Sequence, residues 1–176
     1  PGGRSARRLG STAASRQHCF TLRSPIRVPS AVRTYDSCMA DTNQHSEPEL
    51  LAAAIEVQAK AHVPYSRFHV GAAIRTRSGR IFTSCNVENA AYPQSVCAEA
   101  GAISAMVSGG EYLIDAVLTV CDGDALATCC GGCRQKIREF ADEHTVIHSA
   151  GPDGIRKTYT MADLLPDSFG PENLLD

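Results

Sequence analysis

Residues 113–120 read LIDAVLTV and are the most continuously apolar stretch in the middle of this 176-residue chain. A short apolar run rich in branched residues, with no helical spacing of polar positions, predicts a strand that is buried on both of its faces. Such a strand lies at the centre of a sheet whose two faces are covered. We therefore expect the fold to be built around residues 113–120.

The segments before this strand alternate between helix and strand patterns. Residues 46–62 begin with a capping box and continue as an apolar stripe, which predicts a helix that Pro64 ends. Two apolar runs, 70–75 and 81–83, flank a short glycine-containing turn and predict a hairpin. Residues 95–109 predict a second helix, which a pair of glycines stops.

The segments after the strand continue this alternation. We expect a third helix from about 130 to 140 and two short strands at 145–148 and 157–160. The complete order predicts an α/β domain with a mixed sheet of about five strands covered by helices. The length suits one such domain, and no apolar run reaches the ~20 residues that a membrane span needs.

The charge of the chain is divided between two segments. Residues 1–38 carry seven Arg against one Asp, or +6, whereas residues 39–176 carry ten basic against eighteen acidic residues, or −8, and together they give −2. The Arg- and Ser-rich, acid-poor leader is typical of an organelle transit peptide; a basic arm for nucleic acid or an anionic surface and a solvated tail without a role are the alternatives. We expect residues 1–38 to be disordered, because they hold too little apolar surface to offset the entropy of ordering.

Eight cysteines are many for a domain that is large enough to fold without disulfides, so their spacing matters. Cys130-Gly131-Gly132-Cys133 forms a C-x-x-C motif where the third helix begins, and Cys97 opens the second helix, two residues before Glu99. A helix N-terminus favours the thiolate, which is the form that binds a metal. Three thiolates with an open fourth position are typical of a catalytic zinc site, and Glu99 is spaced to act beside it as a general acid and base. We treat Cys19, Cys38, Cys85 and Cys121 as unpaired thiols.

A C-x-x-C motif alone would leave a redox site, a structural zinc site and chance open, but Cys-Ala-Glu together with C-x-x-C has the form of the zinc-deaminase signature. At this point the sequence resembles the cytidine deaminases, of the small homotetrameric kind with three cysteine ligands. The resemblance runs from about Ser46 to Leu174. It rests on five blocks in the same order: residues 64–73, 86–93, 97–99, 130–135 and 164–171.

The resemblance implies a three-layer α/β/α cytidine deaminase-like fold, with residues 39–176 as the catalytic domain. It also implies one Zn²⁺ per subunit, a homotetramer, and hydrolytic deamination of cytidine and deoxycytidine in pyrimidine salvage. The location implied is the cytoplasm, or the mitochondrion if residues 1–38 are a transit peptide.

The resemblance assigns roles residue by residue. Cys97, Cys130 and Cys133 would bind zinc, and Glu99 would move protons. Asn86 and Glu88 would bind the ribose hydroxyls, and Phe68 would stack on the pyrimidine. Ala98 would offer its backbone to the base. Tyr92 and Phe169 would reach the site of a neighbouring subunit. The plainer interpretations are exposed polar residues for Asn86 and Glu88, core aromatics for Phe68 and Tyr92, and packing within its own subunit for Phe169.

Two positions depart from the family pattern. Cys129 replaces the proline that usually precedes the C-x-x-C motif, which adds a possible rival ligand or a thiol prone to oxidation. Ala100 replaces the arginine that follows the glutamate in many relatives. Zinc with three thiolates carries a net charge of −1, so we expect the helix dipoles or another cation, such as Arg134, to offset it.

Several functions are compatible with these residues. A deaminase of free nucleosides is favoured over a deaminase of polynucleotides, because nucleic-acid binding requires a basic groove and residues 39–176 carry −8. A deaminase of a related aminated nucleoside or nucleoside antibiotic, and a non-catalytic zinc-binding protein with this fold, are the alternatives. We expect a small nucleoside as the partner, and neither nucleic acid nor a membrane.

Overall fold

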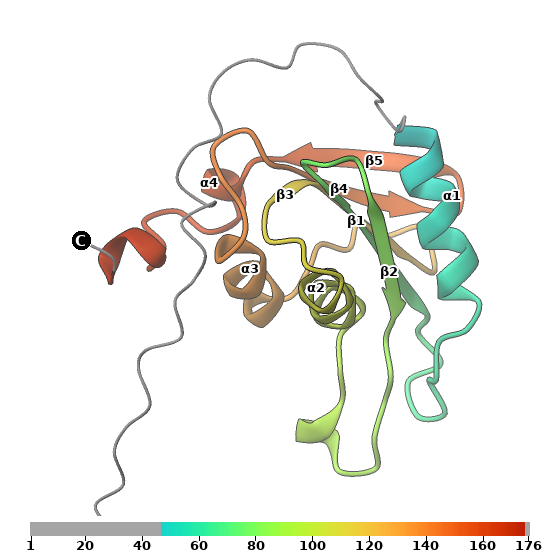
Figure 1. Cartoon of the computed structure of the whole chain (residues 1–176). Helices are drawn as coiled ribbons and strands as arrows, with labels where there is room; N and C mark the ends of the chain where they lie inside the picture. Colours follow the sequence, from blue (N-terminus) through green and yellow to red (C-terminus); the bar gives the residue numbers. More distant parts are fainter. Residues whose placement is uncertain (1–46, 175–176) are drawn as a thin grey trace, which may run out of the picture. The chain divides into compact units, whose positions relative to one another are not determined.

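The computed structural model describes residues 47–174, so the leader and the proposed helix cap at Ser46 lie outside the described part. One sheet holds five strands in the order β2-β1-β3-β4-β5. Pairing of β3 with β4 is parallel and the other pairs are antiparallel, which confirms the predicted mixed sheet. β3 lies at its centre, as the apolar run predicted (Figure 1). The strand bounds are β1 Val70–Thr76, β2 Ile81–Cys85, β3 Ile114–Cys121, β4 Val146–Gly151 and β5 Gly154–Tyr159.

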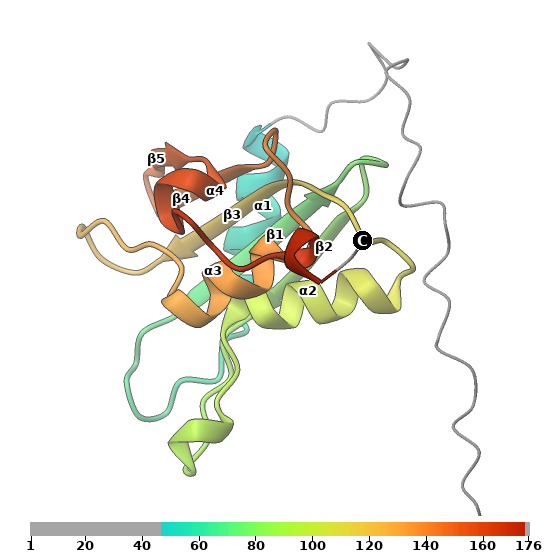
Figure 2. The same cartoon turned by 90° about the vertical axis from the view of Figure 1, so that its left-hand side faces the viewer.

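Helices cover both faces of this sheet, which gives the expected three layers (Figures 1 and 2). α1 (Glu47–Gln58) packs on one face, where Leu50 meets the alternate β3 residues Ala116 and Leu118 in one buried cluster. α2 (Ala98–Ser108) and α3 (Gly131–Arg138) lie on the other face. None of the helices in residues 47–174 is both long and apolar enough to cross a membrane.

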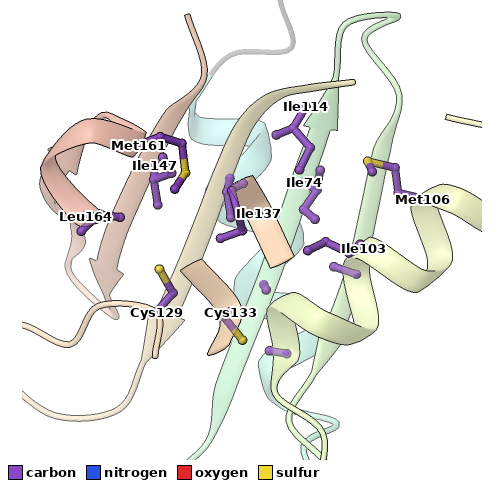
Figure 3. Packing of buried hydrophobic residues seen from close by; sticks show 14 residues of the cluster. Ile74, Ile103, Met106, Ile114, Cys129, Cys133, Ile137, Ile147, Met161 and Leu164 are labelled. Carbon is purple, nitrogen blue, oxygen red and sulfur yellow. The ribbon is translucent and has the colours of Figure 1, made fainter. Parts of the chain in front are cut away.

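The larger apolar core lies between the sheet and α2 and α3. Ile74 of β1, Met106 of α2, Ile137 of α3 and Ile147 of β4 contribute fully buried side chains to it (Figure 3). This core fixes the helices against the strands and thereby sets where their N-termini lie. A short helix, α4 (Met161–Leu164), closes its far side.

The bounds differ from the predicted ones by a few residues at several ends, and α2 begins at Ala98 instead of 95. β5 begins at Gly154 instead of 157, because Gly154 (φ +129°) takes a backbone conformation that favours glycine and lets β4 turn tightly into β5. α1 ends at Gln58, short of 62. The sequence did not predict α4 or the 3₁₀ turns at Tyr92–Gln94 and Pro171–Asn173.

His148 is a titratable group inside the sheet. Its side chain is 2% exposed, Nδ1 lies 2.9 Å from Oγ1 of Thr158, and Nε2 has no hydrogen-bond partner within the described residues. Burial lowers the pKa of His148; the positive charge of Arg75 acts in the same direction and the carboxylate of Glu47 opposes it. The folded protein therefore holds this imidazole neutral.

We expect His148 to lower the stability of the folded protein in acid. The unfolded side chain takes up a proton near pH 6.5, whereas the folded one resists it, so the free energy of unfolding falls as the pH falls below that value. One such group contributes a slope of at most about 1.4 kcal/mol per pH unit. Urea unfolding of wild type and His148→Gln at about pH 7.5 and pH 5.5 measures the difference. His144→Gln, which changes an exposed histidine, is the control. Equal slopes of the free energy of unfolding against pH for His148→Gln and wild type would contradict the prediction.

Candidate metal centre and adjoining pocket

Three cysteine sulfurs meet where α2 and α3 begin. Cys97 caps α2, Cys130 caps α3, and Cys133 lies in the first turn of α3. The three Sγ atoms lie within 4.8 Å of one another, and those of Cys97 and Cys130 are 3.8 Å apart. The fold thus brings together the three sulfurs that the two motifs predicted.

The geometry of this cluster fits a tetrahedral zinc ion. Zn–S bonds of about 2.3 Å at tetrahedral angles place two sulfurs about 3.8 Å apart. Cys97 and Cys130 are exposed and Cys133 is buried, so the cluster is open on one side. Within residues 47–174 no other three metal-ligating side chains come this close, and His62 and His69 lie outside the group.

The cluster itself promotes a thiolate at Cys97. The hydrogen bond from the Cys133 thiol is the main cause that lowers the pKa of Cys97 to about 6, and the Cys130 thiol and the Lys136 ammonium act in the same direction. The pKa of Cys133 is raised in return, by this hydrogen bond and by burial. An anionic sulfur at the helix N-terminus is the form required for a metal ligand.

Glu99 lies beside the cluster in the first turn of α2 and is only 4% exposed. Its Oε2 is 3.4 Å from Sγ of Cys133, and the Thr119 hydroxyl of β3 lies 3.5 Å from its Oε1. The carboxylate is therefore close to the metal position without belonging to the three-sulfur group. Thr119 was missed in the sequence, because it is one polar residue in an apolar strand; its contact depends on β3 presenting alternate residues to α2.

Cys129 does not join the cluster. It is 3% exposed and belongs to the buried core with Ile137 and Leu164; its sulfur and that of Cys133 point in opposite directions (Figure 3). Burial is the main cause that raises the pKa of Cys129 to about 11. A buried, protonated thiol is a poor ligand and a poor target for oxidation, so both roles considered for it are disfavoured.

A pocket of about 450 Å³ opens next to Cys97, a volume typical of small-molecule sites. Of the predicted substrate residues, Asn86, Glu88 and Tyr92 contribute to its wall, whereas Phe68, Ala98 and Phe169 do not. The complete lining is Tyr65, Ser66, Asn86, Val87, Glu88, Tyr92, Ser95, Val96 and Cys97.

Glu88 is held in place by the backbone. Its Oε2 accepts hydrogen bonds from the N–H groups of Tyr65 and Ser66 at 2.9 and 3.2 Å. The Ser66 hydroxyl is the main cause that lowers the pKa of Glu88, and these N–H groups add to it. Both backbone hydrogen bonds engage Oε2 and fix the orientation of this carboxylate at the pocket wall.

Asn86 fixes the segment that carries Phe68. Its Oδ1 accepts from the N–H of Val70 and its Nδ2 donates to the carbonyl oxygen of Phe68, both at 2.9 Å. Each group can form one further hydrogen bond. Asn86 therefore positions Phe68, a connection that the sequence did not indicate.

The predicted aromatic residues are exposed, so the core interpretation is wrong for Phe68 (41% exposed) and Tyr92 (71%). The segment between β2 and α2 projects from the domain (Figure 1). Within it, Tyr92 begins the 3₁₀ turn Tyr92–Gln94 and contacts Tyr65 edge to face, with ring centroids 5.9 Å apart. Phe169 is 59% exposed, so packing within its own subunit does not cover it. Of these aromatics, Tyr92 lines the pocket together with Tyr65, and exposed aromatic side chains beside a pocket indicate a surface that is completed by a ligand or a partner.

Known proteins are similar to this chain in sequence and in fold. The "Cytidine and deoxycytidylate deaminase zinc-binding region" matches residues 44–149. The cytidine deaminase of Sporosarcina psychrophila is 37% identical over 126 residues, covering 72% of this chain and 93% of that protein. The one from Mycobacterium tuberculosis is 38% identical over 122 residues, covering 69% and 87%. The crystal structure of the Burkholderia pseudomallei cytidine deaminase has a TM-score of 0.67 at 34% identity, covering 70% of this chain and 99% of that one.

Proposed function

The chain belongs to the cytidine and deoxycytidylate deaminase family, and from this premise we propose the role of individual residues in metal binding, substrate binding and catalysis. It is a zinc-dependent hydrolase that deaminates cytidine. The observation that carries the assignment is the buried Glu99 carboxylate, 3.4 Å from one sulfur of an open three-sulfur cluster, beside a pocket of nucleoside size.

In this proposal Cys97, Cys130 and Cys133 hold one Zn²⁺ per subunit. Zn²⁺ held by these three sulfurs would supply Lewis-acid chemistry, which lowers the pKa of water and makes it a nucleophile near neutral pH. Glu99 accepts the proton that the attacking water loses as its oxygen bonds to C4 of the base. Glu99 gives this proton to N3, then takes the second proton from the hydroxyl formed at C4 and passes it to the leaving amino group, so cytidine and water become uridine and ammonia.

The substrate is held by residues around the pocket. Glu88 and Asn86 bind the ribose hydroxyls, Phe68 stacks on the pyrimidine and Ala98 offers its backbone to the base. Tyr92 and Phe169 act on the site of a neighbouring subunit in a homotetramer, which their exposure in the single chain supports. Deoxycytidine is the second substrate, and pyrimidine salvage in the cytoplasm is the role; residues 1–38 would direct the enzyme to mitochondria if they are a transit peptide.

We expect turnover of the free nucleoside and not of the polymer, because residues 39–176 carry −8 and lack the charge that phosphates require. The test follows the loss of cytidine absorbance with the purified protein, with and without a chelator, and with single-stranded DNA as a competing substrate. Chelator-sensitive loss of cytidine, with the DNA unchanged, supports the proposal. Deamination of the DNA would contradict it, and zinc binding without any turnover would favour a non-catalytic role.

A further inference from the structure

The loop between β3 and α3 delivers one zinc ligand, Cys130, to the cluster. Residues 122–130 have no regular secondary structure, and Cys130 is exposed at the end of this loop. A ligand in this setting keeps its position only if other groups fasten the loop. Two arginine side chains do so: Arg156 Nη1 donates to the carbonyl of Ala125 at 3.0 Å, and Arg134 binds the residues just before Cys130.

Arg134 makes three hydrogen bonds with three different parts of its guanidinium. Nε donates to the carbonyl oxygen of Cys129 at 3.0 Å, and Nη2 donates to Oγ1 of Thr128 at 2.8 Å. Nη1 donates to the carbonyl oxygen of Leu164, the last residue of α4, at 3.0 Å. One planar side chain thus joins the ligand loop to α3 and to α4.

This arrangement acts on Cys130 through its backbone. The Cys129 carbonyl belongs to the peptide bond that leads into Cys130, so fixing its orientation fixes the Cα position and the direction of the sulfur. Removing a group that orients a metal ligand typically weakens metal binding by about ten- to a hundredfold. We propose that Arg134 is a positioning residue for the zinc ligand Cys130, acting by the geometry of its hydrogen bonds.

The alternative is that Arg134 acts through its charge, by offsetting the thiolates. Two of its three acceptors, the Cys129 carbonyl and the Thr128 hydroxyl, lie in the loop, and the third, the Leu164 carbonyl, lies in α4. Lys136 lies one turn after Gly132 with its ammonium 3.4 Å from that residue's carbonyl oxygen, so a second cation is already near the start of α3. Lysine at position 134 keeps the charge but cannot reproduce a planar fork, so it separates the two roles.

The inference rests on the proposed ligand set, which cobalt binding tests separately. Full-length protein freed of metal is titrated with Co²⁺, whose thiolate charge-transfer absorption reports sulfur ligation without any activity, and with Zn²⁺ against a chromogenic chelator. Absorption in the wild type that is lost in Cys130→Ser supports the ligand set. Absence of this absorption in the wild type would contradict the ligand set itself.

Where the wild type shows the thiolate-to-cobalt absorption, we expect Arg134→Gln and Arg134→Lys each to weaken zinc binding by about ten- to a hundredfold. Both variants should also alter the cobalt spectrum. Arg138→Gln is the matched control, since Arg138 lies one turn further along α3 and bonds Ser168 and Glu172 instead of the loop. Its zinc affinity should equal that of the wild type, although it also loses hydrogen bonds.

Three outcomes would overturn the inference: full zinc affinity in both Arg134 variants, rescue by Arg134→Lys alone, which would assign the effect to charge, or an equal loss in Arg138→Gln. Thr128→Val removes one acceptor and serves as the milder variant if the Arg134 variants do not fold. We expect it to weaken zinc binding severalfold, and an unchanged affinity would also overturn the inference.

Discussion

Replacing Glu99 by glutamine is expected to leave zinc bound and to reduce turnover of cytidine by at least about a thousandfold. The amide has the shape of the carboxylate, and its oxygen can still accept from the Thr119 hydroxyl, which lies 3.5 Å from Oε1 in the wild type. The amide N–H can face the Cys133 sulfur, which lies 3.4 Å from Oε2. The packing around this residue is therefore kept.

The loss arises because glutamine cannot take up a proton. The proposed reaction uses this one side chain first to move a proton from water to the base and then to move a second proton from the hydroxyl formed at C4 to the leaving group. A single acid or base step is worth about 10² to 10⁴ in rate, and here several steps pass through the same carboxylate. The turnover number should therefore fall much more than the affinity for substrate.

Zinc content, substrate binding and steady-state turnover of Glu99→Gln are the measurements. Glu139→Gln makes the same chemical change on the exposed end of α3 and should behave as the wild type. Near-normal turnover in Glu99→Gln would remove Glu99 from its proposed role. Loss of zinc from the variant would show instead that the carboxylate supports the metal.

Much of the fold could be predicted because its strongest signals are local. The apolar run at 113–120 indicated a strand covered on both faces, and the structure places it at the centre of a sheet with helices on each side. β5 was placed too late, because Arg156 and Lys157 on an edge strand hide its pattern and its start depends on the turn at Gly154. The single turn of α4 is set by a capping box at Thr160 and packing of Met161, features too short to stand out in a sequence.

The same division applies to the site. The sequence allowed the three cysteines to be predicted, because each lies in a short motif of fixed spacing at the start of a helix: Cys97, Cys130 and Cys133. The fold needed only to bring the two helix N-termini together. Contacts across the fold gave no local signal. Arg134 reaches Leu164 across 30 residues, and Thr119 reaches Glu99 across 20.

Cys129 shows most clearly which property of a site residue could not be predicted from the sequence. In the sequence it is a thiol next to a ligand, and its neighbour Cys130 carries the same side chain. Only the fold separates them: Cys130 is the exposed cap of α3 and faces Cys97, whereas Cys129 is buried in the core. Adjacent residues of one type thus receive opposite environments.

This contrast gives a second prediction, in which the same substitution at two neighbouring positions has opposite effects. Cys130→Ala removes one of three protein ligands and should weaken zinc binding by more than about a hundredfold, which exceeds the loss expected for a residue that only orients a ligand. Turnover should be abolished, because the remaining two sulfurs cannot hold the metal in place for Glu99. The free energy of unfolding should also lose the part that zinc binding contributes.

Cys129→Ala should keep one zinc per chain and the wild-type turnover. Its cost is confined to packing: removing a buried sulfur leaves a small cavity, which lowers the free energy of unfolding by about 1–2 kcal/mol. Zinc content after dialysis, turnover of cytidine, and urea unfolding with saturating zinc distinguish the two variants. Zinc lost from Cys129→Ala would make that residue a ligand after all, and zinc retained with full activity in Cys130→Ala would contradict the three-sulfur centre. Opposite results at the two positions are expected because zinc binding depends on which sulfur faces the helix N-termini and not on the number of cysteines in the motif.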